Sequence, residues 1–292
     1  MPELPDLALY VERARERLVG QVLRRVRLLN PFVLRTALPP IGQAEGRRLL
    51  DVQRLGKRIV LRLEGDRALV IHLMIAGRLR WLAPGDKPPA RLALAAFEFD
   101  HGTLLLTEAG TTRRASLHFV EGGGALAALD AGGLDLFEID RAAFAERLRR
   151  ENHTLKRALT DPHLFSGIGN AYSDEILHRA RLSPLALTRS LVSDEVERLF
   201  DAARGVLGEW TERLRAESPG WPEKVTAFRP GMAVHGRFGQ PCPVCGAPVQ
   251  RIVYATNEAN YCARCQTGGR LLADRALSRL LKASWPKTID EA

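Results

Sequence analysis

The chain has 292 residues with 43 Lys+Arg against 34 Asp+Glu, a formal charge of +9 at pH 7. This length exceeds one usual compact core, so two domains are expected, and the basic excess makes nucleic acid the leading candidate partner. Scattered surface cations fit the charge alone equally well. No run approaches the roughly 18 apolar residues of a membrane span, and Glu3 and Asp6 do not fit a secretory leader. A soluble cytoplasmic protein is therefore expected.

The first expected element is a helix directly behind the N-terminus. The prolines of the opening segment 1–5 should keep that segment extended. Apolar residues then recur at helical spacing, namely Leu7, Tyr10, Val11, Ala14 and Leu18. From residue 22 to about 120, short β-rich runs such as 57–63, 68–73 and 103–106 alternate with turn residues. This alternation predicts a two-sheet sandwich.

A change of pattern follows the Gly-rich exit at 121–134. Long helix-compatible runs at 141–150 and 193–214 predict a helical second domain. The segment 231–266 is too small for its own apolar core and should need a metal to fold. Beyond it, one more amphipathic helix is predicted by Leu271, Leu272, Ala276, Leu280 and Leu281.

All four cysteines form two closely spaced pairs. Cys242-Pro-Val-Cys245 and Cys262-Ala-Arg-Cys265 are separated by sixteen residues, a spacing typical of tetrahedral zinc. Four thiolates leave no position for water, so one structural Zn²⁺ ion is expected. Two disulfides are the alternative, which the lack of other secretory features disfavours. Residues 249–254 and 260–261 between the pairs can form a β-ribbon able to enter a DNA groove.

A second motif runs from Leu155 through Gly167-Ile168-Gly169-Asn170-Ala171-Tyr172. The two glycines permit a tight turn, after which Asn170 should open a helix. Free backbone amides at such a helix start suit a phosphate oxygen. Taken alone, the motif fits an ordinary turn between two helices equally well.

The N-terminus itself is a third candidate. Met1 before the small Pro2 should be removed, which exposes a secondary amine. An α-amine titrates near 8 and a lysine near 10.4, so its neutral nucleophilic fraction at pH 7 is a few hundred times larger, on the order of 10². It can form an iminium with a sugar aldehyde, and Glu3 can move the accompanying protons. Taken alone, Pro-Glu also fits an ordinary flexible start.

Five motifs together, in this order and spacing, resemble the formamidopyrimidine-DNA glycosylase / endonuclease VIII family. They are Pro2-Glu3-Leu4-Pro5, residues 54–58 (Arg-Leu-Gly-Lys-Arg), the block 155–184, residues 234–237 (Val-His-Gly-Arg) and the four cysteines. The resemblance implies an α+β multidomain fold. It comprises a β-sandwich with an N-terminal helix at 1–135, a helix-two-turn-helix domain at 140–230, a zinc ribbon at 231–268 and a helical extension at 269–292.

The resemblance also implies a function. It predicts a monomeric base-excision-repair glycosylase that flips a damaged base out of DNA and then cleaves the strand as a lyase. By this carry-over, Pro2 attacks C1′ of the damaged nucleotide, Glu3 transfers protons, and Lys57 pairs with a phosphate beside the lesion. Lys156 and Asn170, with Tyr172 of the same block, are expected to hold the DNA backbone.

Several positions depart from the family pattern. Asn257 stands where the family carries a phosphate-binding arginine. Arg251 and Arg264 are candidate substitutes, while Glu258 repels phosphate. The residues that should fill the gap left by the flipped base are Ile75 and Arg113, with Ala115 in place of an aromatic ring.

The segment 218–231, where the family often carries a lesion-capping loop, is short and contains Lys224 and Arg229. A preference for oxidised purines is therefore not implied, and the sequence leaves the lesion open. Two other classes of function also stay open: a noncatalytic binder of damaged or abasic DNA on the same fold, and a zinc-ribbon regulator that reads sequence.

Overall fold

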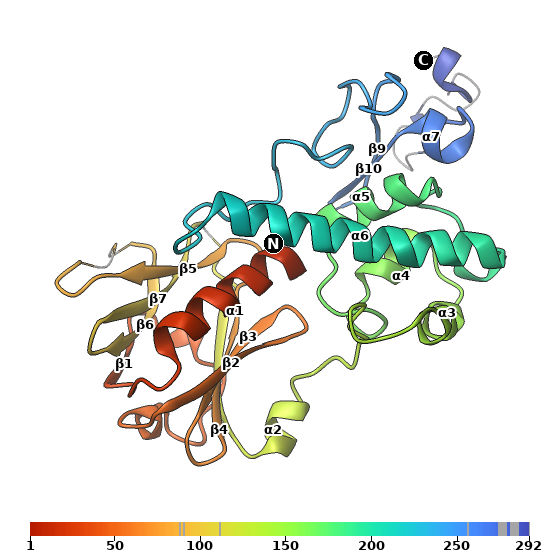
Figure 1. Cartoon of the computed structure of the whole chain (residues 1–292). Coiled ribbons are helices and arrows are strands. Elements are labelled where there is room, and N and C mark those ends of the chain that lie inside the picture. Colours follow the sequence, from red (N-terminus) through yellow and green to blue (C-terminus); the bar gives the residue numbers. More distant parts are fainter. Residues whose placement is uncertain are drawn as a thin grey trace. The chain divides into compact units, whose positions relative to one another are not determined.

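The computed structural model describes residues 1–87, 89, 91–110, 112–255, 257–273, 279–280 and 286–291. It divides into two compact units, residues 1–131 with 210–226, and residues 132–209 with 227–292 (Figure 1). Among the described helices, none combines the length and the apolar character of a membrane span.

The first unit begins with α1 (Leu4–Leu18), which confirms the predicted N-terminal helix. Glu3 is its N-cap in an extended conformation, and its backbone N–H donates to Asp6 Oδ2 (3.0 Å). The expectation that both prolines keep the terminus extended is wrong for Pro5, which occupies the first helical turn. Proline fits there because the first amides of a helix have no intrahelical acceptor.

Two four-stranded antiparallel sheets follow, which confirms the predicted sandwich. Their orders are β1-β6-β7-β5 and β2-β3-β4-β8. The bounds are β1 (Arg25–Leu28), β2 (Leu49–Leu55), β3 (Arg58–Leu63), β4 (Arg67–His72), β5 (Gly77–Leu82), β6 (Ala93–Phe99), β7 (Gly102–Glu108) and β8 (Ser116–Glu121). The short helix α2 (Gly123–Ala127) comes directly after β8.

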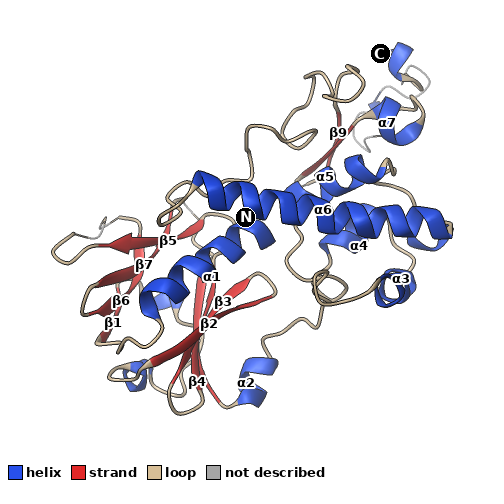
Figure 2. Ribbon diagram, viewed as in Figure 1, coloured by secondary structure: helices blue, strands red, loops and turns tan. Residues whose placement is uncertain are grey.

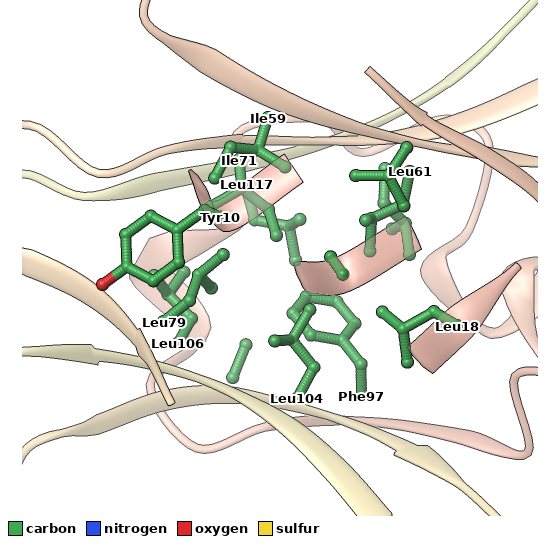
Figure 3. Close-up of a cluster of buried hydrophobic side chains, with 14 of the residues drawn as sticks. Tyr10, Leu18, Ile59, Leu61, Ile71, Leu79, Phe97, Leu104, Leu106 and Leu117 are labelled. Carbon is green, nitrogen blue, oxygen red and sulfur yellow. The ribbon is translucent and has the colours of Figure 1, made fainter. Parts of the chain in front are cut away.

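Alternation along the strands builds the core between the sheets. Ile59 and Leu61 of β3 and Phe97 of β6 point inward and meet Tyr10 and Leu18 of α1 (Figure 3). Burial of such side chains contributes roughly 1.5 to 3 kcal/mol each. The core therefore fixes the start of α1 against the sheets.

The second unit is largely helical, as predicted (Figure 2). Its helices are α3 (Arg141–Arg149), α4 (Leu155–Thr160), α5 (Asn170–Ala180), α6 (Ser193–Glu217) and α7 (Ala263–Thr267). The predicted ribbon is the antiparallel pair β9 (Gln250–Val253) and β10 (Glu258–Tyr261). Residues 210–226, which comprise the end of α6 and the segment after it, group with the first unit.

The C-terminal helix prediction is wrong over residues 269–273, and Ala276 and Leu281 lie outside the described residues. Gly268 and Gly269 both have positive φ, which ends α7. Leu271 N–H then donates to Lys287 O (2.9 Å), and Ile289 N–H donates to Gly269 O (2.8 Å). Leu271, Leu272 and Ile289 pack against Ile252 and Tyr261 of the ribbon. Their apolar character therefore serves ribbon packing.

Candidate functional site

The N-terminal part of the candidate site lies at the start of α1. Pro2 is buried, and Glu3 is only 2% exposed. Burial is the largest influence on the amine of Met1 and lowers its pKa, while Glu3 opposes this and the positive Arg78 and Lys57 reinforce it. A lowered pKa leaves more of the amine neutral and nucleophilic at pH 7. Removal of Met1 transfers the amine to Pro2.

Lys57 reaches this place from the turn between β2 and β3. The turn consists of Gly56 and Lys57, between the paired residues Leu55 and Arg58, and Gly56 has a φ of 61° that favours glycine. Burial lowers the pKa of Lys57, and the Glu3 carboxylate raises it. The structure therefore brings Lys57, distant in sequence, close enough to interact electrostatically with Glu3 and with the terminal amine next to Pro2.

The sequence interpretation missed His72, the last residue of β4. It pairs in register with Arg58, next to Lys57. Burial, followed by Arg58, Lys57 and His118, lowers the pKa of His72 to about 4. A neutral imidazole at pH 7 can donate a hydrogen bond to a phosphate without adding charge. A histidine ending an apolar strand beside the Lys57-Arg58 pair was the available signal.

Ile75 and Arg113 lie on exposed turns of the same unit. Ile75 is 62% exposed at the tip of the turn between β4 and β5, after Met74 with a φ of 52°. Arg113 is exposed and donates to Arg91 O. Buried Glu108 holds the Arg113 loop by accepting the backbone N–H groups of residues 114 and 115.

Ala115, the expected third gap-filling position, is 3% exposed and belongs to the sandwich core. It therefore cannot enter DNA in this conformation. Of the three expected gap-filling positions, only Ile75 and Arg113 are exposed.

In the second unit, Gly169 is the N-cap of α5 and Asn170 is its first residue, as predicted. The Asn170 side chain donates from Nδ2 to Glu258 O (2.9 Å) of the ribbon strand β10. The helix start and the ribbon thus meet at Asn170.

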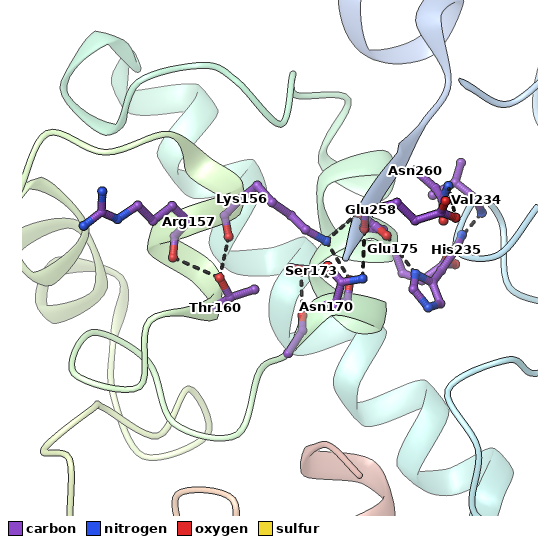
Figure 4. A network of polar contacts seen from close by, with 12 residues as sticks. Lys156, Arg157, Thr160, Asn170, Ser173, Glu175, Val234, His235, Glu258 and Asn260 are labelled. Atoms are coloured by element: carbon purple, nitrogen blue, oxygen red, sulfur yellow. Dashed lines mark hydrogen bonds and ion pairs between the residues drawn. The ribbon is translucent and has the colours of Figure 1, made fainter. Parts of the chain in front are cut away.

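Lys156 and Tyr172, which the resemblance predicts to hold the DNA backbone, have buried side chains. Lys156 is 7% exposed and donates from Nζ to Asp174 Oδ1 (2.5 Å) and Asn170 O (2.6 Å) (Figure 4). Tyr172 is 2% exposed. Both side chains face the interior of the second unit, and a direct contact with DNA stays a prediction.

Lys156 belongs to a buried polar network that joins α4, α5 and the ribbon. The second oxygen of Asp174 accepts from His235 Nδ1 (2.8 Å). Glu175 accepts the backbone N–H groups of residues 233, 234 and 235 at 2.7 to 2.9 Å. Asn260 of β10 accepts from Gly236 N–H (2.8 Å). The network holds residues 233–236, which lead into the ribbon, in a fixed position relative to the start of α5 (Figure 4).

The four cysteines converge, with all Sγ atoms within 4.8 Å of one another. Sγ–Sγ separations of 3.4 Å (Cys245–Cys262) and 3.9 Å (Cys242–Cys265) suit tetrahedral zinc, whose bonds to sulfur are about 2.3 Å. Buried His178 of α5 lies with Nε2 3.3 Å from Cys242 Sγ. A metal-bound thiolate only accepts, so His178 donates this hydrogen bond.

The candidate substitutes for the missing ribbon arginine are both engaged. Arg251 stacks over Phe238, 4.3 Å from the ring centre, and pairs with Glu258 (3.5 Å). Arg264 pairs with Asp290 (2.9 Å). Asn257 itself is exposed, and its carbonyl closes the turn between β9 and β10 by accepting from Tyr254 N–H (2.8 Å).

Three family models match the chain. They are the formamidopyrimidine-DNA glycosylase N-terminal domain over residues 1–115, the H2TH domain of that enzyme over 135–216, and a zinc finger found in FPG and IleRS over 239–268. A formamidopyrimidine-DNA glycosylase of Thermus thermophilus is 38% identical over 282 residues, covering 92% of this chain and all of the relative. The chain belongs to the formamidopyrimidine-DNA glycosylase family. Its four cysteines hold one structural zinc ion.

A second relative and two solved structures also match this chain over about nine tenths of its length. A formamidopyrimidine-DNA glycosylase of Heliobacterium modesticaldum is 34% identical, covering 91% of this chain and 100% of that protein. The crystal structure of the MutM (Fpg) protein from Thermus thermophilus has a TM-score of 0.75 at 34% identity, covering 91% and 98%. A Lactococcus lactis Fpg solved with DNA containing an abasic site shares the fold, with a TM-score of 0.81 at 24% identity and coverage of 91% and 99%.

Proposed function

We propose that this member of the formamidopyrimidine-DNA glycosylase family is a base-excision-repair DNA glycosylase with abasic-site lyase activity. The observation that carries the proposal is the gathering of a buried terminal amine, the Glu3 carboxylate and the Lys57 ammonium at the start of α1. The names of the relatives support the reaction class. Its proposed binding partner is damaged DNA, and its proposed location is the cytoplasm, where it binds the chromosome.

The reaction begins after Met1 has been removed. The neutral Pro2 nitrogen forms a bond to C1′ as the bond from C1′ to the damaged base breaks, and the departing base takes a proton from water. The Glu3 carboxylate accepts the proton that the Pro2 nitrogen loses and passes it to the ring oxygen, so the sugar ring opens and an iminium joins Pro2 to C1′. Loss of a C2′ proton to solvent then expels the 3′ phosphate and cuts the strand. Water finally hydrolyses the iminium, which leaves an aldehyde on the sugar and frees the Pro2 amine.

The surroundings of Pro2 suit these steps. Burial lowers the pKa of the Met1 amine, and the neighbouring Pro2 is buried as well, which favours a neutral Pro2 nucleophile at neutral pH once Met1 is removed. Lys57 and neutral His72 lie where a phosphate flanking the lesion can be held, one by charge and one by a hydrogen bond. Ile75 and Arg113 fill the gap left by the flipped nucleotide.

In the second unit, the proposed DNA-binding element is the start of α5 at Asn170, because the positive end of a helix dipole favours a phosphate. We assign Lys156 and Tyr172 an indirect part, because their buried side chains hold α4 and α5 in place. We propose four functional regions, 1–135, 140–230, 231–268 and 269–292. In the last of them, Leu271, Leu272 and Ile289 pack against the ribbon.

A second candidate function is a noncatalytic binder of damaged or abasic DNA. Asn257 at the arginine position and the buried Ala115 favour it, because both changes affect DNA recognition and leave the chemical groups aside. A noncatalytic binder would not need Pro2, Glu3 and Lys57 together, and this chain has all three.

Borohydride trapping separates the two functions. The protein, with loss of Met1 verified by mass, is incubated with an oligonucleotide containing one abasic site and reduced. We expect a covalent adduct that maps to Pro2, and its loss in the Pro2→Gly variant. If the protein binds this DNA but forms no covalent adduct, the result would contradict the glycosylase function and support the noncatalytic binder.

A further inference from the structure

A strap formed by residues 218–226 covers β5, the edge strand of its sheet, within the first unit. Trp221 Nε1 donates to Leu79 O (2.9 Å), and the Trp221 ring contacts Tyr10 and Trp81 with centroid distances of 5.8 and 6.2 Å. Val225 is buried in the sandwich core. The strap is therefore packed onto the strand at two points.

Arg78 of β5 ties this strap to the turn that carries Ile75. Its Nε donates to Val225 O (2.8 Å), while Nη1 donates to Ile75 O (3.1 Å) and Gly77 O (2.7 Å). Three carbonyls on two separate segments thus converge on one guanidinium, whose planar fork favours such fixed geometry.

The backbone of the turn from Leu73 to Gly77, which carries Ile75, has little conformational freedom. Gly77 N–H donates to Leu73 O (2.8 Å), and a Cβ on Gly77 would lie 2.2 Å from that oxygen. The turn is therefore tight, and the position of Ile75 depends on what its carbonyl is bonded to.

Arg78 also lies close enough for its charge to lower the pKa of the Met1 amine and to oppose the burial that raises the pKa of the Tyr10 hydroxyl. Of the basic side chains acting on the amine, Arg78 has a larger effect than Lys57. A phosphate that binds Lys57 would neutralise part of the positive charge of Lys57. Arg78 is instead bonded to three backbone carbonyls, which hold its positive charge in place.

We propose that Arg78 is a positioning residue of the N-terminal site, which fixes the Ile75 turn and the strap and keeps a permanent positive charge beside the nucleophilic amine. The inference rests on the proposed function of Pro2. It assigns Arg78 two separable effects, one from its hydrogen-bond fork and one from its charge.

Two substitutions separate these effects. Arg78→Lys keeps the charge and loses the fork, whereas Arg78→Gln loses both. Arg80→Gln is the matched control, because Arg80 is an exposed residue two positions further along the same strand. The rate of borohydride trapping is measured under single-turnover conditions with saturating enzyme from pH 5.5 to 9. Amide hydrogen exchange is followed over residues 219–227.

For Arg78→Gln we expect the acid limb of the trapping rate to move to higher pH. The rate at pH 6 should fall by about threefold or more while the rate at pH 9 stays near wild type, because less amine is neutral at low pH. Arg78→Lys should retain the wild-type pH profile, and both Arg78 variants should show faster exchange over the strap. Arg80→Gln should match wild type in both measurements.

Wild-type pH dependence and strap exchange in both Arg78 variants would overturn the inference. An unchanged pH profile in Arg78→Gln alone would refute the effect of charge, since a merely structural loss slows trapping equally at all pH values. Failure of the wild-type protein to trap at any pH would refute the proposed function instead, and strap exchange would then decide the positioning role of Arg78.

Discussion

Glu3 has two roles at the level of a single residue: it caps α1, and it is the proposed proton-transfer group. In Glu3→Gln, the amide cannot supply or take the proton, while its oxygen can still accept a hydrogen bond at the helix start. We expect single-turnover base excision to fall by about 10²-fold or more, with DNA affinity near wild type. Glu16→Gln, on the exposed side of α1, is the control. Normal turnover in Glu3→Gln would exclude this role.

His72 makes stability depend on pH. Its folded pKa of about 4 lies below its ordinary value of 6.5, so the unfolded chain binds more protons between these values. Stability is therefore lost as pH falls from about 6.5 to 4, by up to roughly 3 kcal/mol, with no further loss from this group below pH 4. Urea unfolding of His72→Asn should show a flatter decline across that window than wild type or the exposed control His101→Asn. Parallel declines in all three proteins would contradict the assignment.

Lys156 connects elements rather than presenting a charge. Removing one partner from its buried ion pair with Asp174 should lower the free energy of unfolding by about 3 kcal/mol in Lys156→Ala, measured in urea. Arg157→Ala, exposed on the same helix, should change it little. A stable Lys156→Ala protein with weaker salt dependence of DNA binding would instead restore the direct phosphate contact predicted from sequence.

Asn257 is exposed on the turn between β9 and β10, at the position where the family resemblance predicts a phosphate-binding arginine. Asn257→Arg should strengthen DNA binding and make the slope of log K against log salt concentration more negative by about 0.9, as expected for one added phosphate contact. Asn257→Gln should leave the slope unchanged. An unchanged slope in Asn257→Arg would mean that the exposed turn does not reach the DNA backbone.

The helical and strand periods in the sequence predicted most elements because burial on one face imposes them. Leu7 to Leu18 and the run 57–63 are clear cases. The cysteine pairs were equally informative, since zinc fixes their spacing. Sequence periodicity could not show that Lys156 turns inward, because its buried partner Asp174 lies on the next helix. It also misassigned Leu271 and Leu272, whose apolar side chains pack against a ribbon formed by other segments.

At the scale of the whole molecule, one zinc ion stabilises the ribbon and also its contact with α5 through His178 and Cys242. Zinc chelation should unfold the ribbon and weaken DNA binding, observed by circular dichroism and a binding titration. His178→Phe should speed zinc transfer to a chelator by about tenfold or more, because the hydrogen bond to the Cys242 thiolate is lost. His153→Phe, which alters a histidine paired with Glu151, is the control. Equal transfer rates in all three proteins would show that this bond does not support the zinc site.

The buried Pro2 beside the helix cap Glu3 has a practical consequence for anyone who prepares the protein. An affinity tag fused ahead of Met1, incomplete methionine removal or acetylation of Pro2 would turn the reactive amine into an amide. Such material can fold, hold zinc and bind oligonucleotides while showing no turnover. Purification handles therefore belong at the C-terminal end, and intact mass should be recorded before any preparation is judged inactive. The same blocked protein, made deliberately, is a folded negative control that needs no mutation.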